Sequence, residues 1–387
     1  MFLKTVMERN QPLVRLGIEW QQNGVILPDT YLLDYDTILE NARSIKQAGD
    51  ANGVQNFFML KQIGRNPLIA RALTDMGYVG AVCVDFREAL TMVENQIPLG
   101  NVGHLVQIPR AALKKILRAK PVIVTVYTLE KAREISAVCT ELGLHQKLML
   151  RVLGEGDMLY SGQYGGFELQ ELDSAVRAIE AMPNVEVGGV CSFPCFLYDE
   201  TAQDILPMPN LRTVQTAAEM LRARGYRDLM LNTPSATCTH SIPMIAAAGG
   251  THGEPGHGLT GTTPYHAGHP DAEERPGYLY VSEVSHNLGD KAYCYGGGHY
   301  RRGHMKNALV GTTPENAKVV PVLPPDDSSI DYHFELQQNC PVSAAAVMAF
   351  RTQFFVTRSR VAVVKGLSSG KPELAGLYSA LGEPVQE

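Results

Sequence analysis

Apolar runs and amphipathic segments alternate along much of the chain. Apolar side chains recur at helical spacing in Asp36–Gly49, where Gly49 is expected to end the helix, and again in a segment that Pro67 opens. Between such segments lie short runs of successive apolar residues, for example NFFML, VIVTVY and KLMLRVL. Parallel strands that are covered by helices have this appearance. About eight such units predict an α/β fold in the form of a closed, TIM-like (β/α)8 barrel.

The pattern changes in the last third of the chain. Between Gly249 and Arg302, glycine, histidine, proline and tyrosine are abundant and the helical spacing disappears. Further on, four segments look like strands, namely NAKVVPVLPP, DYHFEL, AFRTQFFVT and SRVAVVKG. The barrel is therefore expected to be followed by an all-β domain.

Charge and cysteine content narrow the functional class. The net charge is −6 with lysine and arginine scattered, so no basic surface for nucleic acid or a membrane is expected. The seven cysteines lie mostly in apolar runs without regular spacing, which indicates buried thiols in a reducing compartment. No window approaches the roughly 20 apolar residues of a membrane span. We therefore expect a cytoplasmic protein without nucleic-acid or membrane partners.

A lysine ends one of the predicted strands. Lys61 follows NFFML, at the carboxyl end of the first barrel strand, and barrel active sites assemble at that end. A lysine in apolar surroundings can be held as a neutral amine, which forms a Schiff base with a carbonyl group. The position also suits a lysine that merely extends into solvent. Lys61 alone leaves both interpretations open.

Two later segments have the composition of a phosphate site. Ser235, Thr237 and Thr239 follow the strand DLMLN, and their hydroxyl groups are potential phosphate donors. The glycines of GGTHGEPGHGLTG, Gly249–Gly261, allow close approach of the backbone to a ligand. Both segments come after the last predicted strands, where barrels commonly bind phosphate. Together they favour a phosphate-bearing ligand in the barrel that carries Lys61.

Three motifs in order, FFMLKQIGRNP, LMLNTPSATCT and EPGHGLTG, resemble the alanine racemase-like, fold-type III family of pyridoxal 5′-phosphate enzymes, and its YhfX branch most of all. The KQIGRNP stretch is also similar to the lysine motif of the ornithine racemase relatives. The resemblance implies pyridoxal phosphate as cofactor, a barrel over residues 30–266, and a β-domain in which residues 1–29 pack with residues 267–387. It also implies a homodimer whose active sites are shared across the interface.

The resemblance assigns roles to individual residues. Lys61 corresponds to the Schiff-base lysine, which also acts as acid and base on one face of the substrate α-carbon. Ser235 and Thr237 resemble the phosphate donors. The backbone of Gly256 and of its neighbour His257 is expected to assist them.

Two positions depart from the family, and a third has two interpretations. In alanine racemases an arginine at the position of Glu254 faces the pyridine nitrogen of the cofactor. A carboxylate at this position would favour a protonated pyridine ring, which withdraws electrons more strongly. Alternatively, Glu254 only caps the glycine turn. Gln163 lies about where relatives have an arginine near the cofactor hydroxyl. Arg65 either touches the phosphate or is a solvated helix cap.

A second proton carrier is expected from the β-domain of the partner. The segment AYCYGGGHYRRGH, Ala292–His304, resembles the place where the family has a tyrosine with that role. Tyr295 is the first candidate for this catalytic role, with His299 and Tyr300 after it. In the alternative interpretation, the segment contains only strand residues and turns.

Eight of the eleven histidines lie between His240 and His304. Some relatives in the family place a divalent metal beside the cofactor, but no pair here shows a strong metal spacing, and no metal is predicted. Three functions stay open. The favoured one is an amino-acid racemase or epimerase with two bases; the others are a lyase of the aldolase or dehydratase type, and a pyridoxal phosphate-binding protein without turnover.

Overall fold

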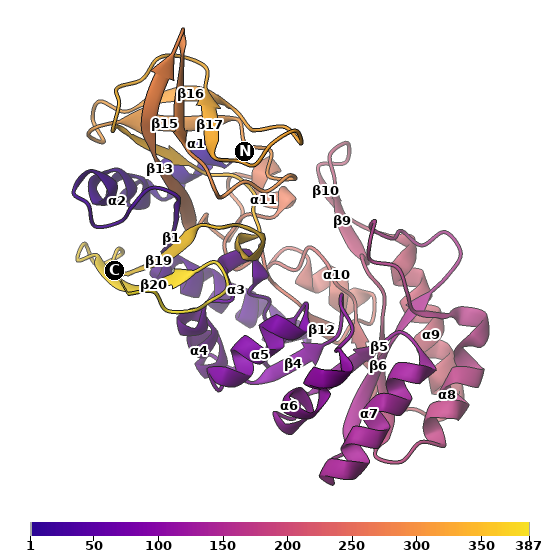
Figure 1. Cartoon of the computed structure of the whole chain (residues 1–387). Helices are drawn as coiled ribbons and strands as arrows, with labels where there is room; N and C mark the ends of the chain where they lie inside the picture. The colour runs from indigo at the N-terminus through magenta and orange to yellow at the C-terminus, as the bar shows by residue number, and fades with distance from the viewer. Residues whose placement is uncertain (1, 387) are drawn as a thin grey trace. The chain divides into compact units, whose positions relative to one another are not determined.

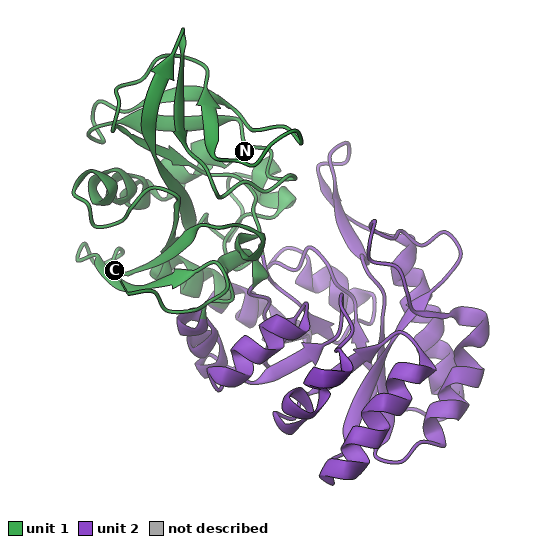
Figure 2. Cartoon of the chain, in the orientation of Figure 1, with its two compact units in different colours: residues 1–42, 61–66, 257–387 green, residues 43–60, 67–256 purple. Residues whose placement is uncertain are grey.

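The computed structural model describes residues 2–386, which divide into two compact units (Figure 2). Unit 1 contains the chain up to Ala42, residues 61–66, and the chain from His257 onward. Unit 2 contains residues 43–60 and 67–256. The domain boundaries expected at residues 30 and 266 stay a prediction, and the outermost residues of that prediction, Met1 and Glu387, lie outside the described residues.

Unit 2 is the predicted parallel barrel (Figure 1). Its strands follow the spatial order β2-β12-β11-β8-β6-β5-β4-β3, and a bridge between Phe58 and Ala81 joins the two ends of this series. A short strand, β7, pairs with β6 outside the series. The strands are β2 Gln55–Asn56, β3 Ala81–Cys83, β4 Leu99–Val102, β5 Ile123–Val126, β6 Gln146–Leu153, β7 Phe167–Glu168, β8 Val185–Cys191, β11 Met230–Asn232 and β12 His252–Gly253.

Helices connect these strands, as the amphipathic spacing predicts. Local sequence sets their ends: the Thr128 hydroxyl accepts a bond from the first turn of α7, and Gly143 ends that helix at a φ of 65°. A hairpin of β9 (Phe196–Asp199) and β10 (Asp204–Pro207) follows β8. The helices are α4 Pro67–Asp75, α5 Phe86–Glu94, α6 Leu113–Arg118, α7 Leu129–Leu142, α8 Leu172–Glu180, α9 Pro209–Ala223 and α10 Ile242–Ala247. Within residues 2–386, no helix has both the length and the apolar character needed to cross a membrane.

One predicted helix end is wrong. Helix α3 runs from Tyr35 to Asn52 and therefore continues through Gly49. A Cβ atom on Gly49 would lie 2.5 Å from Asn56 Nδ2, so this glycine allows close packing and is no stop signal. The next glycine, Gly53, has a φ of 69° and follows the last helical residue.

Unit 1 is built on a nine-stranded sheet in the order β14-β17-β16-β15-β18-β13-β1-β19-β20. Because β14 also pairs with β13, the first six strands of this series close into a small antiparallel barrel. Only β1 and β19 pair in parallel among the described strands of this unit. The strands are β1 Thr30–Asp34, β13 Tyr278–Leu288, β14 Lys291–Tyr295, β15 Asn307–Gly311, β16 Lys318–Leu323, β17 His333–Leu336, β18 Ala345–Met348, β19 Arg360–Lys365 and β20 Glu373–Ser379.

The N-terminal helices α1 (Leu3–Arg9) and α2 (Gln11–Gln22) pack on this sheet. Their buried side chains, among them Leu13 and Ile18, form one apolar cluster with Leu279 of β13 and Val347 of β18. Burial of such side chains stabilises the fold by about 1.5–3 kcal/mol each. A short helix, α11 (Pro264–Gly268), begins with a capping box at Thr263.

One predicted strand is also wrong. The segment AFRTQFFVT, residues 349–357, lies beyond the end of β18 and contains a short 3₁₀ helix, Phe354–Val356. Phe354 is fully buried and stacks on Tyr31 with ring centroids 3.8 Å apart. Its aromatic side chain therefore serves the core without strand pairing. The expected burial of the cysteines is confirmed, because all seven are free and buried.

Candidate active site

Lys61 opens a short 3₁₀ helix, Lys61–Ile63, just beyond the first barrel strand. Backbone bonds from Phe57 to Gly253 and from Met59 to Pro255 extend that strand to within two residues of the lysine. Lys61 is only 9% exposed, so the interpretation of a lysine that extends into solvent is wrong. Within unit 1 its helix packs against the 3₁₀ helix Phe354–Val356.

His257 is a buried histidine of the same unit. Burial lowers the pKa of its imidazole well below the usual value, and the nearby cations Arg351 and Lys61 lower it further. The Nδ1 atom lies 3.4 Å from the Thr262 hydroxyl, whereas Nε2 is buried without a hydrogen-bond partner among the described residues. The lowered pKa favours the neutral imidazole, and Nε2 is the ring nitrogen that is available to a ligand.

Arg65 is 2% exposed and adopts a left-handed backbone with a φ of 54°. Its guanidinium lies over the ring of Phe355, 5.3 Å from the centroid. The solvated helix cap that was one of two expectations for Arg65 is therefore wrong. Its contact with a phosphate stays a prediction.

Glu254 lies in unit 2 with only 5% of its surface exposed. Its Oε1 accepts a hydrogen bond from Asn232 Nδ2 at 2.6 Å and one from Asn101 Nδ2 at 3.3 Å, and His104 Nε2 lies 3.8 Å from Oε2. Sequence reasoning missed Asn101 and Asn232. The available signal was a single amide side chain within each of two otherwise apolar strands, β4 and β11.

The two predicted phosphate donors differ in their hydrogen bonds. Thr237 Oγ1 accepts the backbone N–H of Glu254 at 3.2 Å, so its own proton is available to an acceptor. Ser235 Oγ donates to the carbonyl of Phe196 at 2.6 Å, so its proton is already engaged. The structure therefore brings Thr237 next to Glu254, which lies two residues before Gly256 in the sequence. Of the two hydroxyls, Thr237 is the better prepared donor.

Gln163 lies beside a buried arginine that sequence reasoning missed. Arg151 Nη2 donates to the backbone carbonyl of Gln163, and Nη1 donates to the hydroxyl of Tyr127, both at 2.8 Å. The side-chain Oε1 of Gln163 is buried without a partner among the described residues. The signal for Arg151 was a charged residue inside the apolar run KLMLRVL.

Tyr295 and His299 belong to the β-domain of unit 1. Tyr295 ends β14, is 39% exposed, and has its ring centroid 5.9 Å from that of His333. His299 is half-buried, its backbone N–H donates to Asp331 Oδ2 at 2.9 Å, and burial lowers the pKa of its imidazole. Nδ1 of His299 is buried without a partner among residues 2–386. The structure does not bring the two side chains together.

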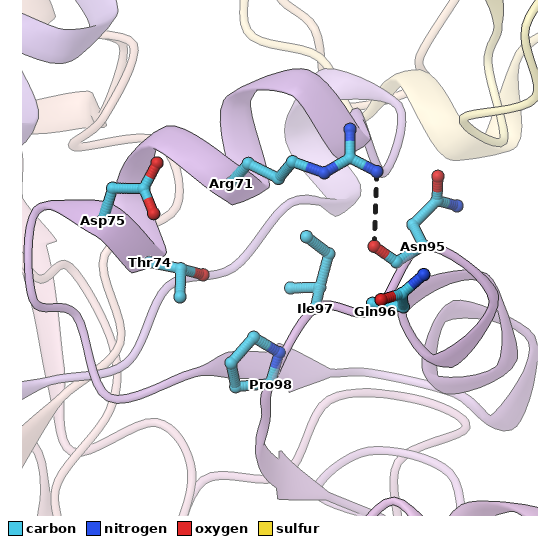
Figure 3. A pocket seen from close by; sticks show the side chains of 7 residues that line it. All are labelled: Arg71, Thr74, Asp75, Asn95, Gln96, Ile97 and Pro98. Carbon is cyan, nitrogen blue, oxygen red and sulfur yellow. Dashed lines mark hydrogen bonds between the residues drawn. The ribbon is translucent and has the colours of Figure 1, made fainter.

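A hollow of about 300 Å³ lies elsewhere on unit 2 (Figure 3). Its lining comes from the end of α4 and from the turn that leads into β4, where Arg71 donates to the carbonyl of Asn95 at 3.3 Å. Because this turn precedes β4, the hollow borders the amino-terminal end of the strand, away from the end where barrel active sites form. It contains none of the predicted site residues. Within the described part of the chain, no three histidine, cysteine or acidic side chains are grouped to hold a metal ion.

Comparison with known proteins places this geometry in a family. The model of the alanine racemase N-terminal domain matches residues 33–264, and the model of the YhfX-like C-terminal domain matches residues 279–374. An uncharacterized protein YhfX of Escherichia coli (strain K12) is 43% identical over 387 residues, which cover 100% of both chains. Both the barrel and the β-domain are therefore shared with known sequences.

Solved structures confirm the fold. D-threonine aldolase from Filomicrobium marinum is similar with a TM-score of 0.67 and 16% identity, over 92% of this chain and 94% of its own. Alanine racemase of Clostridium difficile 630 has a TM-score of 0.66 and 15% identity, over 92% and 99%. D-threo-3-hydroxyaspartate dehydratase from Delftia sp. HT23 has a TM-score of 0.64 and 14% identity, over 91% and 96%. With its barrel, its small β-domain and these matches, the chain belongs to the alanine racemase N-terminal domain family and carries a YhfX-like C-terminal domain.

Proposed function

We propose that this protein is a pyridoxal phosphate-dependent enzyme that exchanges the α-proton of a free amino acid, as a racemase or epimerase. The family supports this, because similar folds occur in proteins named as a racemase, an aldolase and a dehydratase of amino acids. The observation that carries the proposal is Lys61. A lysine that is 9% exposed, directly beyond the first barrel strand, suits covalent binding of a carbonyl group.

The residues present fit this cofactor. Lys61 would bind it covalently, and Thr237, which has a hydroxyl proton to donate, would bind its phosphate. The backbone of Gly256 and the buried His257, with Nε2 unpartnered among the described residues, would assist. Glu254, which two asparagines hold in place, would face the ring nitrogen. Bound pyridoxal phosphate supplies an electron sink that stabilises the carbanion formed when the α-proton leaves.

Two groups would move the proton. The Nζ atom of Lys61 takes the α-proton on one face of the substrate and returns it there. On the other face the carrier is Tyr295, contributed by the β-domain of a second copy in a homodimer. The exposure of Tyr295 supports this role, because a side chain that reaches the active site of another subunit has to be exposed on the surface of its own domain.

Reduction and absorbance test the cofactor assignment. We expect purified protein to show visible absorbance that borohydride removes, and mass spectrometry to locate the added mass on the peptide of Lys61. Lys61→Ala should lose both signals. Lys114→Ala is the control, because Lys114 is a surface residue that pairs with Glu141. Absorbance that persists in Lys61→Ala would refute the proposal.

Proton exchange in heavy water tests the reaction. For a racemase, NMR should show that the α-proton of one amino acid in a panel is replaced while the enantiomer accumulates. Loss of a β-substituent or cleavage to an aldehyde would identify a lyase instead. Cofactor binding without exchange of any amino acid would identify a binding protein.

A further inference from the structure

Arg151 is a buried cation of unit 2 that has no anion in contact. It lies near the carboxyl end of β6 with an exposure of 0%. Its two hydrogen bonds go to neutral oxygens, the hydroxyl of Tyr127 and the backbone carbonyl of Gln163, and its guanidinium lies over the Tyr127 ring, 5.0 Å from the centroid. Its Nε atom is buried and has no hydrogen-bond partner in the described chain. No carboxylate within residues 2–386 lies at ion-pair distance from it.

The acidic groups beside Arg151 stay neutral or are engaged elsewhere. Burial raises the pKa of the Tyr127 phenol, although Arg151 opposes that shift. Burial raises the pKa of the Cys191 thiol, the register partner of Arg151 on β8, to about 12. Glu254 also influences Cys191, but its carboxylate accepts from Asn101 and Asn232. Arg151 therefore has no internal counter-ion in direct contact.

A cation in this position needs an explanation beyond packing. A buried charge is strongly destabilising unless an anion and hydrogen bonds satisfy it, and an apolar side chain of similar volume is usually at least as stable. An arginine offers a planar pair of N–H donors that matches the two oxygens of a carboxylate. The carboxyl ends of barrel strands are also where ligands bind.

We infer that Arg151 binds the carboxylate group of the amino-acid substrate, an inference that rests on the proposed function. The carboxylate replaces the carbonyl of Gln163 as acceptor. Gln163 lies in a segment between β6 and β7 where Gly162 and Gly165 have φ values of 77° and 128°. Such glycines adopt backbone conformations that other residues disfavour, which allows this segment to rearrange around the ligand.

Calorimetric titration of the cofactor-loaded protein with propionate and with the neutral analogue propionamide tests this inference. Wild-type protein should bind propionate and not propionamide. Arg151→Met should raise the Kd for propionate more than tenfold, and Arg151→Lys, which keeps the charge without the planar donors, should raise it about fivefold. Arg177→Met is the matched control, because Arg177 is a surface arginine that pairs with Asp173. It should leave the Kd unchanged.

Three results would overturn the inference: equal binding of propionate and propionamide, no binding of either, or a Kd in Arg151→Met within threefold of wild type. If Arg151→Met does not fold, Arg151→Lys decides by the same criterion. Visible absorbance is recorded in every sample. An absent cofactor signal in wild type refutes the proposed function, whereas a normal signal with unaltered propionate binding in the variants refutes only the role of Arg151.

Discussion

Tyr295 and His299 lie on opposite faces of the β14–β17 pair, although only three residues separate them in sequence. The ring of Tyr295 lies beside His333, whereas that of His299 lies 6.3 Å from Phe334, which is fully buried. Neighbouring residues of a strand point to opposite faces, so His333 and Phe334 mark the two sides. Tyr295 and His299, two of the three candidates for the second proton carrier, therefore have different surroundings.

Substitution separates these candidates. We expect Tyr295→Phe to lower racemisation by a factor of about 10² to 10⁴, the usual contribution of a positioned proton carrier, while exchange on the Lys61 face persists. His299→Gln should change racemisation less than about threefold. Enantiomer formation and deuterium incorporation are measured on the same samples. The reverse order of effects would assign the role to His299.

The buried carboxylate of Glu254 predicts a stability effect. Glu254→Gln keeps the oxygen that accepts from the two asparagine N–H groups but turns the carboxyl group into an amide, a weaker acceptor, so both hydrogen bonds weaken. We expect the free energy of unfolding to fall by about 1–3 kcal/mol in urea denaturation. Glu219→Gln, on the exposed face of α9, is the control and should fall within about 0.5 kcal/mol of wild type. Equal stability of the two variants would contradict the burial of Glu254.

Asp29 predicts a dependence of stability on pH. Burial, and to a smaller extent the charge of Asp331, raises the pKa of its carboxyl to about 6. The hydrogen bonds from Ser359 and Tyr280 and the charge of Arg358 oppose this increase. The folded state then binds more protons than the unfolded state. This contribution is fully present below about pH 4 and is lost as the pH rises through about 6, by at most about 3 kcal/mol.

Asp29→Asn isolates this effect, because other groups titrate in the same range. Burial lowers the pKa of His252 to about 4, and this group acts in the opposite direction. We expect wild type to lose stability relative to Asp29→Asn between pH 4 and pH 7. Urea denaturation at both pH values provides the comparison. A difference that stays constant with pH would show that folding does not raise the pKa of Asp29.

Gly297, one of the three glycines after Tyr295, is expected to tolerate no side chain. Gly297 has a φ of 127°, and a Cβ atom there would lie 1.9 Å from Asp29 Oδ2. Gly289 has a φ of 64° with open space around it. We expect Gly289→Ala to cost about 1–2 kcal/mol from backbone strain alone, and Gly297→Ala to cost at least about 2 kcal/mol more. Thermal unfolding measures both, and similar losses would contradict the close approach.

Much of the fold and part of the candidate site followed from sequence. The alternation of apolar runs and amphipathic helices indicated the barrel. A strand that is buried on both faces leaves a continuous apolar run, and a helix that is buried on one face leaves apolar residues at helical spacing. The place of Lys61 after NFFML put it next to a strand end, where it lies in the structure. Two predictions were wrong because residues selected for packing resemble local signals. Gly49 allows close packing but resembles a helix stop, and the apolar side chains of residues 349–357 serve the core but resemble a strand.

By itself, the sequence determined the parallel barrel, the following β-domain, the burial of the cysteines and the strand-end place of Lys61, because each depends on neighbouring residues. Only the tertiary structure decided that Asn101 and Asn232 bind Glu254. It also decided that Arg151 is buried without an anion in contact within the described chain. The same holds for the opposite faces on which Tyr295 and His299 lie. These relations join residues far apart in sequence or depend on strand register. Register and long-range pairing are set by packing of the whole chain, and no local period records them.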